Sequence, residues 1–165
     1  MRTFIAKSMI VFVSGLFATA AFAQSLEQQV ALCMTGDPTL LDQKIAGCTA
    51  LISSGRLSEE NLAAAFNSRG NAYDDKMDYS QAIADYNEAL RYDPQSSMAF
   101  FNRGQSFSRQ QNHDRAIADY SEAIRLKPQY AKAYYGRGIS ERRLGKSAES
   151  AADIARACAI DPGYC

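Results

Sequence analysis

The chain has 165 residues, and its 18 basic and 18 acidic side chains give a formal net charge of zero. A neutral balance offers neither the basic excess that binds nucleic acid nor an acidic tail that attracts a cationic partner. Pro is scarce at four residues, and 47% of the side chains are hydrophobic, which argues against a disordered chain. This length and composition fit one folded domain.

Residues 1–23 have the pattern of a cleaved secretory signal peptide. Two basic residues precede an apolar run over 9–17, and the small residues Ala21 and Ala23 occupy the positions that a signal peptidase reads. The apolar run is short for a bilayer span of about 20 residues, so a retained membrane anchor is the weaker alternative. We therefore expect an exported protein that begins near Gln24, with no stable membrane insertion after cleavage.

The four cysteines are expected to be oxidised in an exported protein. None of Cys33, Cys48, Cys158 and Cys165 forms a Cys-x-x-Cys motif, so neither a redox centre nor a zinc ribbon is indicated. The favoured pairings join cysteines that are close in sequence, Cys33 with Cys48 and Cys158 with Cys165. The other two connectivities would link opposite ends of the chain. Free buried thiols are the alternative.

Similar residues recur every 34 positions from residue 66 onward. The columns are Phe66, Phe100 and Tyr134; Arg69, Arg103 and Arg137; Gly70, Gly104 and Gly138; Ala82, Ala116 and Ser150; Asp85, Asp119 and Asp153; Tyr86, Tyr120 and Ile154; Ala89, Ala123 and Ala157; and Pro94, Pro128 and Pro162. Tandem agreement in so many columns predicts three copies of one structural unit, over 63–96, 97–130 and 131–165.

Each unit is predicted to contain two helices. In the first unit Phe66, Gly70 and Tyr73 lie at i, i+4 and i+7, which places them on one face of a helix over about 61–75. A second helix with the same spacing follows a break and ends before Pro94, which cannot continue it. The Gly of the first helix and the Ala residues of the second let the two backbones approach closely.

This helix pair resembles the tetratricopeptide repeat family, whose aromatic–Gly–aromatic set, Ala–Tyr–Ala set and closing Pro all recur here in tandem. The resemblance implies an all-α fold, a right-handed α-α superhelix of antiparallel hairpins. The chain departs from the family pattern at Arg69, where Leu usually precedes the Gly, and at Glu141, which replaces an aromatic residue. Together with the signal peptide, the repeat sequences resemble the exported bacterial branch of the family, which implies a periplasmic location.

Residues 24–62 are predicted to form a helical extension, a degenerate half-repeat that shields the first full unit. Ile45, Cys48 and Ile52 have helical spacing, and Cys48 and Ile52 fall one repeat period before Ala82 and Tyr86.

The Arg and Asp columns are predicted to form structural ion pairs. Arg69 and Asp85, Arg103 and Asp119, and Arg137 and Asp153 have the same separation in all three units, across one hairpin. Such pairs can be bidentate. Because they recur in every unit, a packing role is the better explanation than a ligand site.

The resemblance also implies a binding surface, because in this family the first helices of successive hairpins line a concave groove that takes a peptide or a helix. The groove-facing positions are Asn67, Asn71, Asp74 and Asp75 in the first unit, Phe101, Asn102, Gln105 and Arg109 in the second, and Lys132, Tyr135, Ile139, Arg142 and Arg143 in the third. Such a groove would run from acidic to basic, with the anionic end of a ligand at the third unit. The alternative is that these positions are merely solvated helix faces.

The carboxylate-clamp subfamily offers a narrower comparison. Asn71, Asn102 and Lys132 match the clamp's positions, whereas Asn67 and Gly136 stand where the clamp carries basic residues. Loss of two cations removes much of the attraction for a carboxylate, so we do not expect a clamp of that kind.

Nothing in the sequence predicts catalysis. The chain has no nucleophile elbow, metal-binding His motif or phosphate-binding loop, and its lone His113 falls in a turn that is expected to be solvated. We expect no cofactor, no metal and no enzyme activity, but an adaptor or scaffold whose partner is another protein. The alternative is an assembly protein that binds a second copy of itself through the C-terminal unit, where Ile154 and its neighbours would lack a covering helix.

Overall fold

A computed structural model describes residues 27–165, so the predicted signal peptide lies outside the described residues. The described part begins with helical residues 27–34. The elements that follow are η1 (Pro38–Leu40), α2 (Leu41–Ser53), α3 (Glu59–Asp75), α4 (Tyr79–Tyr92), α5 (Ser97–Arg109), α6 (His113–Leu126), α7 (Ala131–Arg143), α8 (Ser147–Ile160) and η2 (Pro162–Tyr164). No strand occurs between residues 27 and 165.

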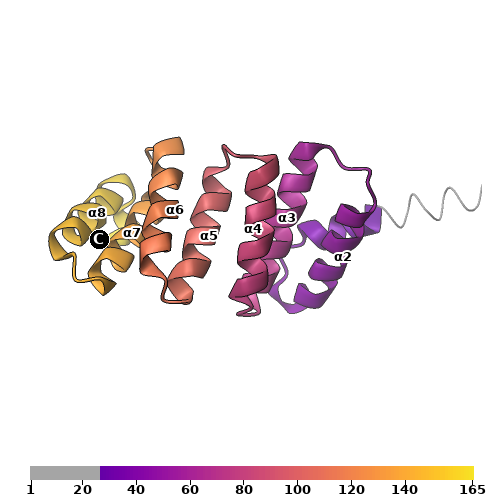
Figure 1. Cartoon of the computed structure of the whole chain (residues 1–165), viewed down its shortest axis with the longest axis horizontal. Helices are drawn as coiled ribbons and strands as arrows, with labels where there is room; N and C mark the ends of the chain where they lie inside the picture. The colour runs from indigo at the N-terminus through magenta and orange to yellow at the C-terminus, as the bar shows by residue number, and fades with distance from the viewer. Residues whose placement is uncertain (1–26) are drawn as a thin grey trace, which may run out of the picture.

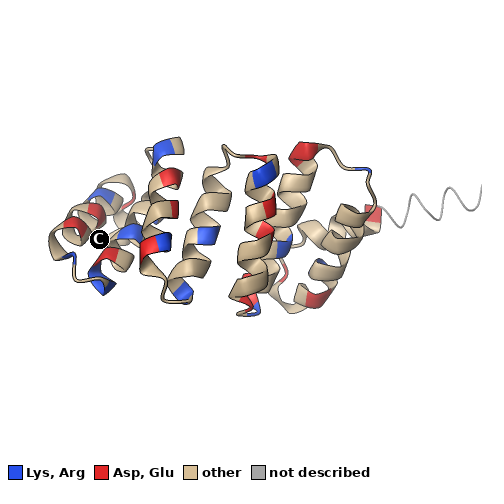
Figure 2. Cartoon of the chain, in the orientation of Figure 1, with Lys and Arg blue, Asp and Glu red and all other residues tan. Residues whose placement is uncertain are grey.

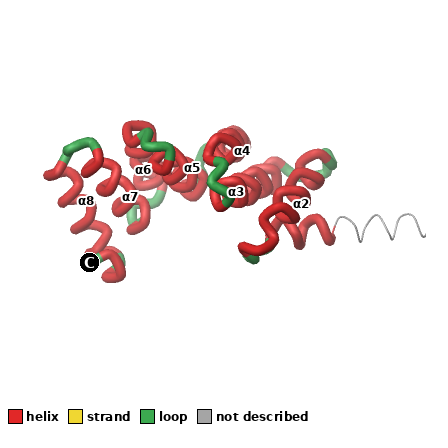
Figure 3. Tube along the Cα trace, turned by 90° about the horizontal axis from the view of Figure 1, so that it is seen from below, coloured by secondary structure: helices red, strands yellow, loops and turns green. Residues whose placement is uncertain are grey.

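Consecutive helices lie side by side in one row, from α2 at one end to α8 at the other (Figure 1). The view along the helices shows the same order, with α3 and α4, α5 and α6, and α7 and α8 as successive hairpins (Figure 3). This arrangement confirms the predicted fold class, a right-handed α-α superhelix.

The ends of the helices are set by short polar side chains and by one repeated backbone conformation. Ser58, Asp78 and Ser96 each accept a hydrogen bond from a backbone N–H in the first turn of the helix that follows. Between the two helices of the first two hairpins, Met77 and Gln111 have positive φ angles of 63° and 61°. The third hairpin places Gly145 at the corresponding position, where Gly adopts this conformation without strain.

The cores of the first two hairpins depend on a Gly opposite a Tyr. Tyr86 is 1% exposed, and a Cβ atom added to Gly70 would lie 2.7 Å from its Cε1 atom. Gly104 and Tyr120 repeat the contact, at 3.0 Å. The Gly column therefore lets the first helix rest directly on the ring of the second, as a close-packed interior requires.

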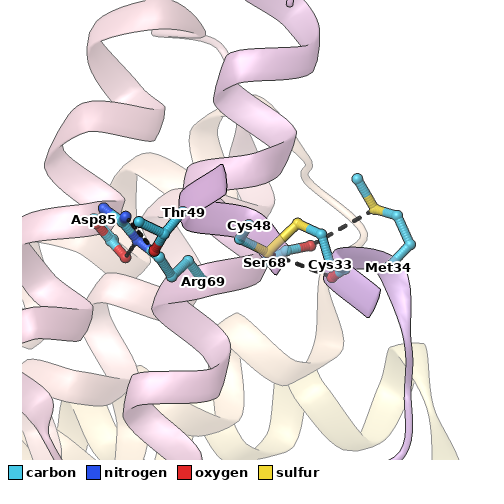
Figure 4. Close-up of a disulfide and its surroundings, with 7 residues drawn as sticks. All are labelled: Cys33, Met34, Cys48, Thr49, Ser68, Arg69 and Asp85. Carbon is cyan, nitrogen blue, oxygen red and sulfur yellow. Dashed lines mark hydrogen bonds and ion pairs between the residues drawn. A yellow bond between two sulfur atoms is a disulfide. The ribbon is translucent and has the colours of Figure 1, made fainter. Parts of the chain in front are cut away.

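Residues 27–34 and α2 form the N-terminal half-repeat, and the Cys33–Cys48 disulfide joins them with a Cα–Cα distance of 4.6 Å (Figure 4). Arg69 donates from Nη1 to Thr49 Oγ1, as Arg103 donates to Asn87 Oδ1 in the next unit.

The register of the half-repeat differs from the prediction. One repeat period before Asn87 stands Ser53, but the residue that accepts from the Arg is Thr49, one helical turn earlier. Helix α3 begins at Glu59, two residues before the helix start expected at about 61 and four residues before the position one repeat period ahead of Ser97, where α5 begins. The half-repeat is therefore displaced by about one helical turn, and the expected equivalence of Cys48 with Ala82 does not hold.

Candidate functional site

The structure brings each predicted Arg–Asp pair together as a bidentate ion pair. Arg103 donates from Nε and Nη2 to the two carboxylate oxygens of Asp119, at 2.8 and 2.7 Å. The same geometry joins Arg69 to Asp85 and Arg137 to Asp153.

The Arg103 guanidinium makes two further contacts. Its Nη1 donates to Asn87 Oδ1 of the preceding hairpin at 2.7 Å, and its Cζ atom lies 5.5 Å from the ring centre of Phe100. Since the guanidinium joins two hairpins through these bonds, this column has the structural role that the sequence predicts.

Three of the predicted groove residues hold the first two hairpins together. Asn102 donates from Nδ2 to Asn67 Oδ1 at 3.1 Å and to Asn71 Oδ1 at 3.0 Å. Asn71 Oδ1 also accepts the hydroxyl proton of Tyr86 at 2.8 Å. Asn67 is only 7% exposed, so its predicted place on an open groove face is wrong. Two residues of the clamp comparison, Asn71 and Asn102, are likewise bonded to neighbouring side chains.

Asp74 and Phe101 are two more groove predictions that the structure corrects. Asp74 is buried, accepts a hydrogen bond from Ser106 Oγ at 2.6 Å and forms an ion pair with Arg109. Its charge is therefore neutralised within the fold and does not make that end of the groove acidic. Phe101 is a core residue whose ring centre lies 5.8 Å from that of Tyr120, because the α5 face that carries it turns towards α6.

The groove residues of the third unit remain accessible. Lys132, Arg142 and Arg143 on α7 are exposed. Tyr135 is 38% exposed, and its ring packs against Tyr164 of η2 with a centre-to-centre distance of 5.0 Å. The second disulfide, Cys158–Cys165, holds η2 in this position.

Two adjoining hollows lie between α5 and α7, and we call them together the α5–α7 trough. One, of about 370 Å³, is lined by Ser108, Gln111, His113, Ile139 and Arg143. The other, of about 210 Å³, is lined by Gln105, Ser108, Arg109, Tyr120, Tyr135, Gly136 and Ile139. They share Ser108 and Ile139, so the trough is continuous from Tyr135 to Arg143.

The sequence did not point to several of these lining residues. Ser108, Gln111, Tyr120 and Gly136 were not predicted as site residues, and His113 was expected in a solvated turn. Instead His113 is the first residue of α6, half-buried, with an Nδ1 atom that is buried without a hydrogen-bond partner in the described part of the chain. One signal was available: Gly136 replaces Asn102 in its repeat column and so removes the side chain that fills the groove one unit earlier.

Other kinds of site are not found in residues 27–165. This part of the chain contains no cluster of three or more side chains that could hold a metal ion. It also contains no helix with the length and apolar character needed to cross a membrane.

Comparison with known proteins agrees with the repeat geometry. The model of the tetratricopeptide repeat family matches residues 67–131 and again 101–164. The chain belongs to the tetratricopeptide repeat family. No curated protein matches it in sequence.

Several solved structures share the fold of this tetratricopeptide repeat protein. The MamA protein superimposes with a TM-score of 0.72 at 20% identity, over 89% of this chain and 77% of MamA. The TPR domain of Arabidopsis OM64 gives 0.64 at 24% identity, over 64% of this chain and 88% of that domain. The second TPR domain of human RPAP3, solved in complex with the HSP70 peptide SGPTIEEVD, gives 0.62 at 27% identity, over 64% of this chain and 88% of that one.

Proposed function

We propose that this protein is a non-catalytic adaptor of the bacterial periplasm that binds a segment of another polypeptide in the α5–α7 trough. The periplasmic location rests on the signal-peptide pattern of residues 1–23. The interaction role is supported by the family and by the peptide complex of human RPAP3, which is 27% identical to this chain.

The observation that carries the proposal is the contrast between the two halves of the groove. Between α3 and α5, the side chains of Asn67, Asn71, Asp74 and Asn102 bond to one another or to neighbouring residues. A hollow of about 280 Å³ also lies between α3 and α5, but its lining includes these bonded side chains. The hollows between α5 and α7 are lined instead by Tyr135, Ile139 and Arg143, and α7 also carries the exposed cations Lys132 and Arg142. A bound segment would therefore gain hydrogen bonds and ion pairs in the α5–α7 trough without breaking those that hold the hairpins together.

The charge on the groove-lining helices favours a ligand of defined orientation. Outside the ion pairs described above, α3 carries Glu59, Glu60 and Asp75, α5 carries no charged side chain, and α7 carries Lys132, Arg142, Arg143 and Glu141. Figure 2 shows how the charges are distributed along the row of helices. An acidic segment would thus be drawn towards α7.

The proposal is tested by reversing the exposed positive charges of α7, of which Arg143 lines the trough. A variant with Lys132, Arg142 and Arg143 changed to Glu is compared with wild type in capture of periplasmic proteins, with photocrosslinking from position 135, which lines the trough and is exposed. We expect the variant to lose the partners that wild type captures and crosslinks, while its helical circular dichroism is unchanged.

A matched control carries the same change of charge on the second helices, with Arg91, Arg125 and Lys127 replaced by Glu. These three residues are exposed and lie outside the trough. The control should capture the same partners as wild type. Equal loss in both variants, or capture that neither change affects, would contradict binding in the trough.

A further inference from the structure

We propose that the α5–α7 trough contains a carboxylate subsite, in which Tyr120, Arg109 and Gln105 receive an Asp or Glu side chain of the bound segment. The inference rests on the proposed function and specifies the chemistry of its ligand. It uses positions other than 71, 102 and 132, which the carboxylate-clamp comparison singled out.

The hydroxyl of Tyr120 is a hydrogen-bond donor without a partner. Tyr86, its counterpart one repeat earlier, donates its hydroxyl proton to Asn71 Oδ1 at 2.8 Å. Tyr120 is 2% exposed and lines the smaller hollow, but its hydroxyl has no hydrogen-bond partner within residues 27–165. The hydroxyl oxygen is accessible from the hollow, so it can donate to an acceptor that a ligand supplies there.

Two substitutions in the repeat columns leave this donor free. Gln105 occupies the column of Asn71, and Gly136 occupies the column of Asn102. Because Gly136 has no side chain, the α7 backbone lies against the Tyr120 ring, and an added Cβ would be 2.8 Å from Tyr120 Cζ. The hydrogen bond between Asn102 and Asn71 that joins α5 to α3 therefore has no equivalent between α7 and α5.

The other polar groups at this hollow are suited to an anion. Arg109 pairs with Asp74 on one side and lines the hollow on the other, and its side chain is 44% exposed. A phenol is protonated at neutral pH and can donate, and burial raises the pKa of Tyr120 further above its ordinary value of 10. A guanidinium and a phenol both donate, and a carboxylate accepts several such bonds at once. This donor set selects an acidic side chain over a neutral one.

The structure offers a matched pair of variants for the test. Tyr120→Phe removes a hydroxyl that makes no hydrogen bond in the described part of the chain, and Tyr86→Phe removes one that is bonded to Asn71. A randomised peptide library is selected against the wild-type protein, and the affinities of the selected peptides are measured by isothermal titration calorimetry. Each peptide is then remade with Asn for Asp or Gln for Glu.

We expect the selected peptides to share an acidic position, and its amide substitution to weaken binding to wild type by about tenfold or more. Against Tyr120→Phe the acidic and amide peptides should bind almost equally, so that the two changes couple in a double-mutant cycle. Tyr86→Phe should retain the wild-type preference.

The remaining outcomes separate the subsite from the proposed function. Selected peptides without a shared acidic position, or a preference that Tyr120→Phe leaves intact, would overturn the subsite while peptide binding stands. If wild type selected no peptides at all, the proposed function would fail, and the subsite with it.

Discussion

The Arg column shows how one side chain can join two hairpins. Each guanidinium forms a bidentate ion pair within its own hairpin and donates once to the preceding one, from Arg69 to Thr49, from Arg103 to Asn87 and from Arg137 to Ser121. The hydrogen bond to the paired Asp raises the pKa of Arg69 and Arg137, so these groups stay charged. The Arg column therefore links neighbouring hairpins through hydrogen bonds, as the columns of small and aromatic residues do through packing.

The Arg103–Asp119 pair should contribute far more to stability than an exposed pair. We expect a double-mutant cycle with Arg103→Ala and Asp119→Ala to give a coupling energy of about 2 kcal/mol, because Asp119 is buried and its loss leaves a charge unpaired. Urea denaturation measures it. The control is the exposed Arg125–Glu122 pair on α6, with an expected coupling of about 0.5 kcal/mol. Equal coupling in the two cycles would show that the buried pair has no special role.

Glu141 occupies a position where the earlier units have Tyr73 and Phe107. Its side chain is nearly buried, with Oε2 lacking a hydrogen-bond partner in the described residues and Nε of Arg137 4.0 Å from Oε1. Burial raises the pKa of Glu141 above its ordinary value of 4.5, and the negative charge of Asp153 adds to the effect. The third unit thus keeps a carboxylate where an aromatic ring would pack.

Replacement of Glu141 by Gln should stabilise the protein at neutral pH. Because the pKa of Glu141 is raised in the folded state, the folded chain binds this proton more tightly than the unfolded chain does. Protonation of Glu141 therefore stabilises the fold at low pH, and that stabilisation is lost as pH rises through the folded-state pKa. Thermal unfolding should show Glu141→Gln melting above wild type at pH 7, with the difference shrinking as pH falls towards 4.5. Glu60→Gln, at an exposed position on α3, should give no such increase. A gain for Glu141→Gln that did not vary with pH would rule out this explanation.

At the scale of the helices, the first two hairpins are closed by the same devices. A polar cap starts the second helix, a residue with positive φ makes the turn, and a Gly lets the first helix approach a buried Tyr. The third hairpin keeps the positive φ at Gly145, but Gly138 meets Ile154 and α8 begins without a side-chain cap. The N-terminal half-repeat is held together in a different way. Gly47 packs against residues 29–33, and the Cys33–Cys48 bond replaces the larger core of a full hairpin.

Removal of the Cys33–Cys48 disulfide should destabilise the N-terminal half-repeat. The double change to Ala opens a loop of about 15 residues and should lower the free energy of unfolding by about 3 kcal/mol. Both cysteines are fully buried, so packing is lost as well. Hydrogen exchange should locate the effect in α2.

The Cys158–Cys165 pair provides the comparison, because its loop is shorter and Cys165 is exposed. We expect its removal to lower the free energy of unfolding by less than removal of the first pair, and to affect η2 and the end of α8. A cost equal to that of the first pair would contradict the role given to the buried disulfide.

The whole molecule is a linear array, so its stability should vary along its length. The central hairpin of α5 and α6 packs on neighbours at both sides, whereas α8 packs on α7 and η2. In such arrays each unit is stabilised mainly by its nearest neighbours. We therefore expect native-state hydrogen exchange to be slowest in α5 and α6 and faster in α8. Uniform protection from α3 to α8 would instead indicate that the array unfolds as one cooperative unit.

Much of the fold could be predicted from the sequence, because a strictly periodic repeat marks every buried position several times. The hairpins, the small and aromatic columns and the bidentate pairing of Arg103 with Asp119 all follow from that period. The half-repeat was assigned the wrong register, since α3 begins one turn early and nothing in the repeat columns marks the added turn.

The candidate site was only partly predictable. Periodicity identifies which residues share a helix face, but it does not show whether a side chain on that face meets a neighbour from the next hairpin. For that reason Asn67, Asp74 and Phe101 were expected on the groove surface and are buried instead. The lining residues Tyr120 and His113 come from α6, which was not expected to reach the groove.

The sequence by itself determined the helical hairpins, their repeat and the column of ion pairs, because each depends on contacts at a fixed spacing along the chain. Tertiary structure decided which groove side chains are bonded to a neighbouring hairpin. That depends on contacts between hairpins: Asn102 bonds across to α3, while Gly136 leaves Tyr120 without an acceptor. A local sequence pattern does not contain such contacts, since they arise only when successive units are stacked at a particular distance.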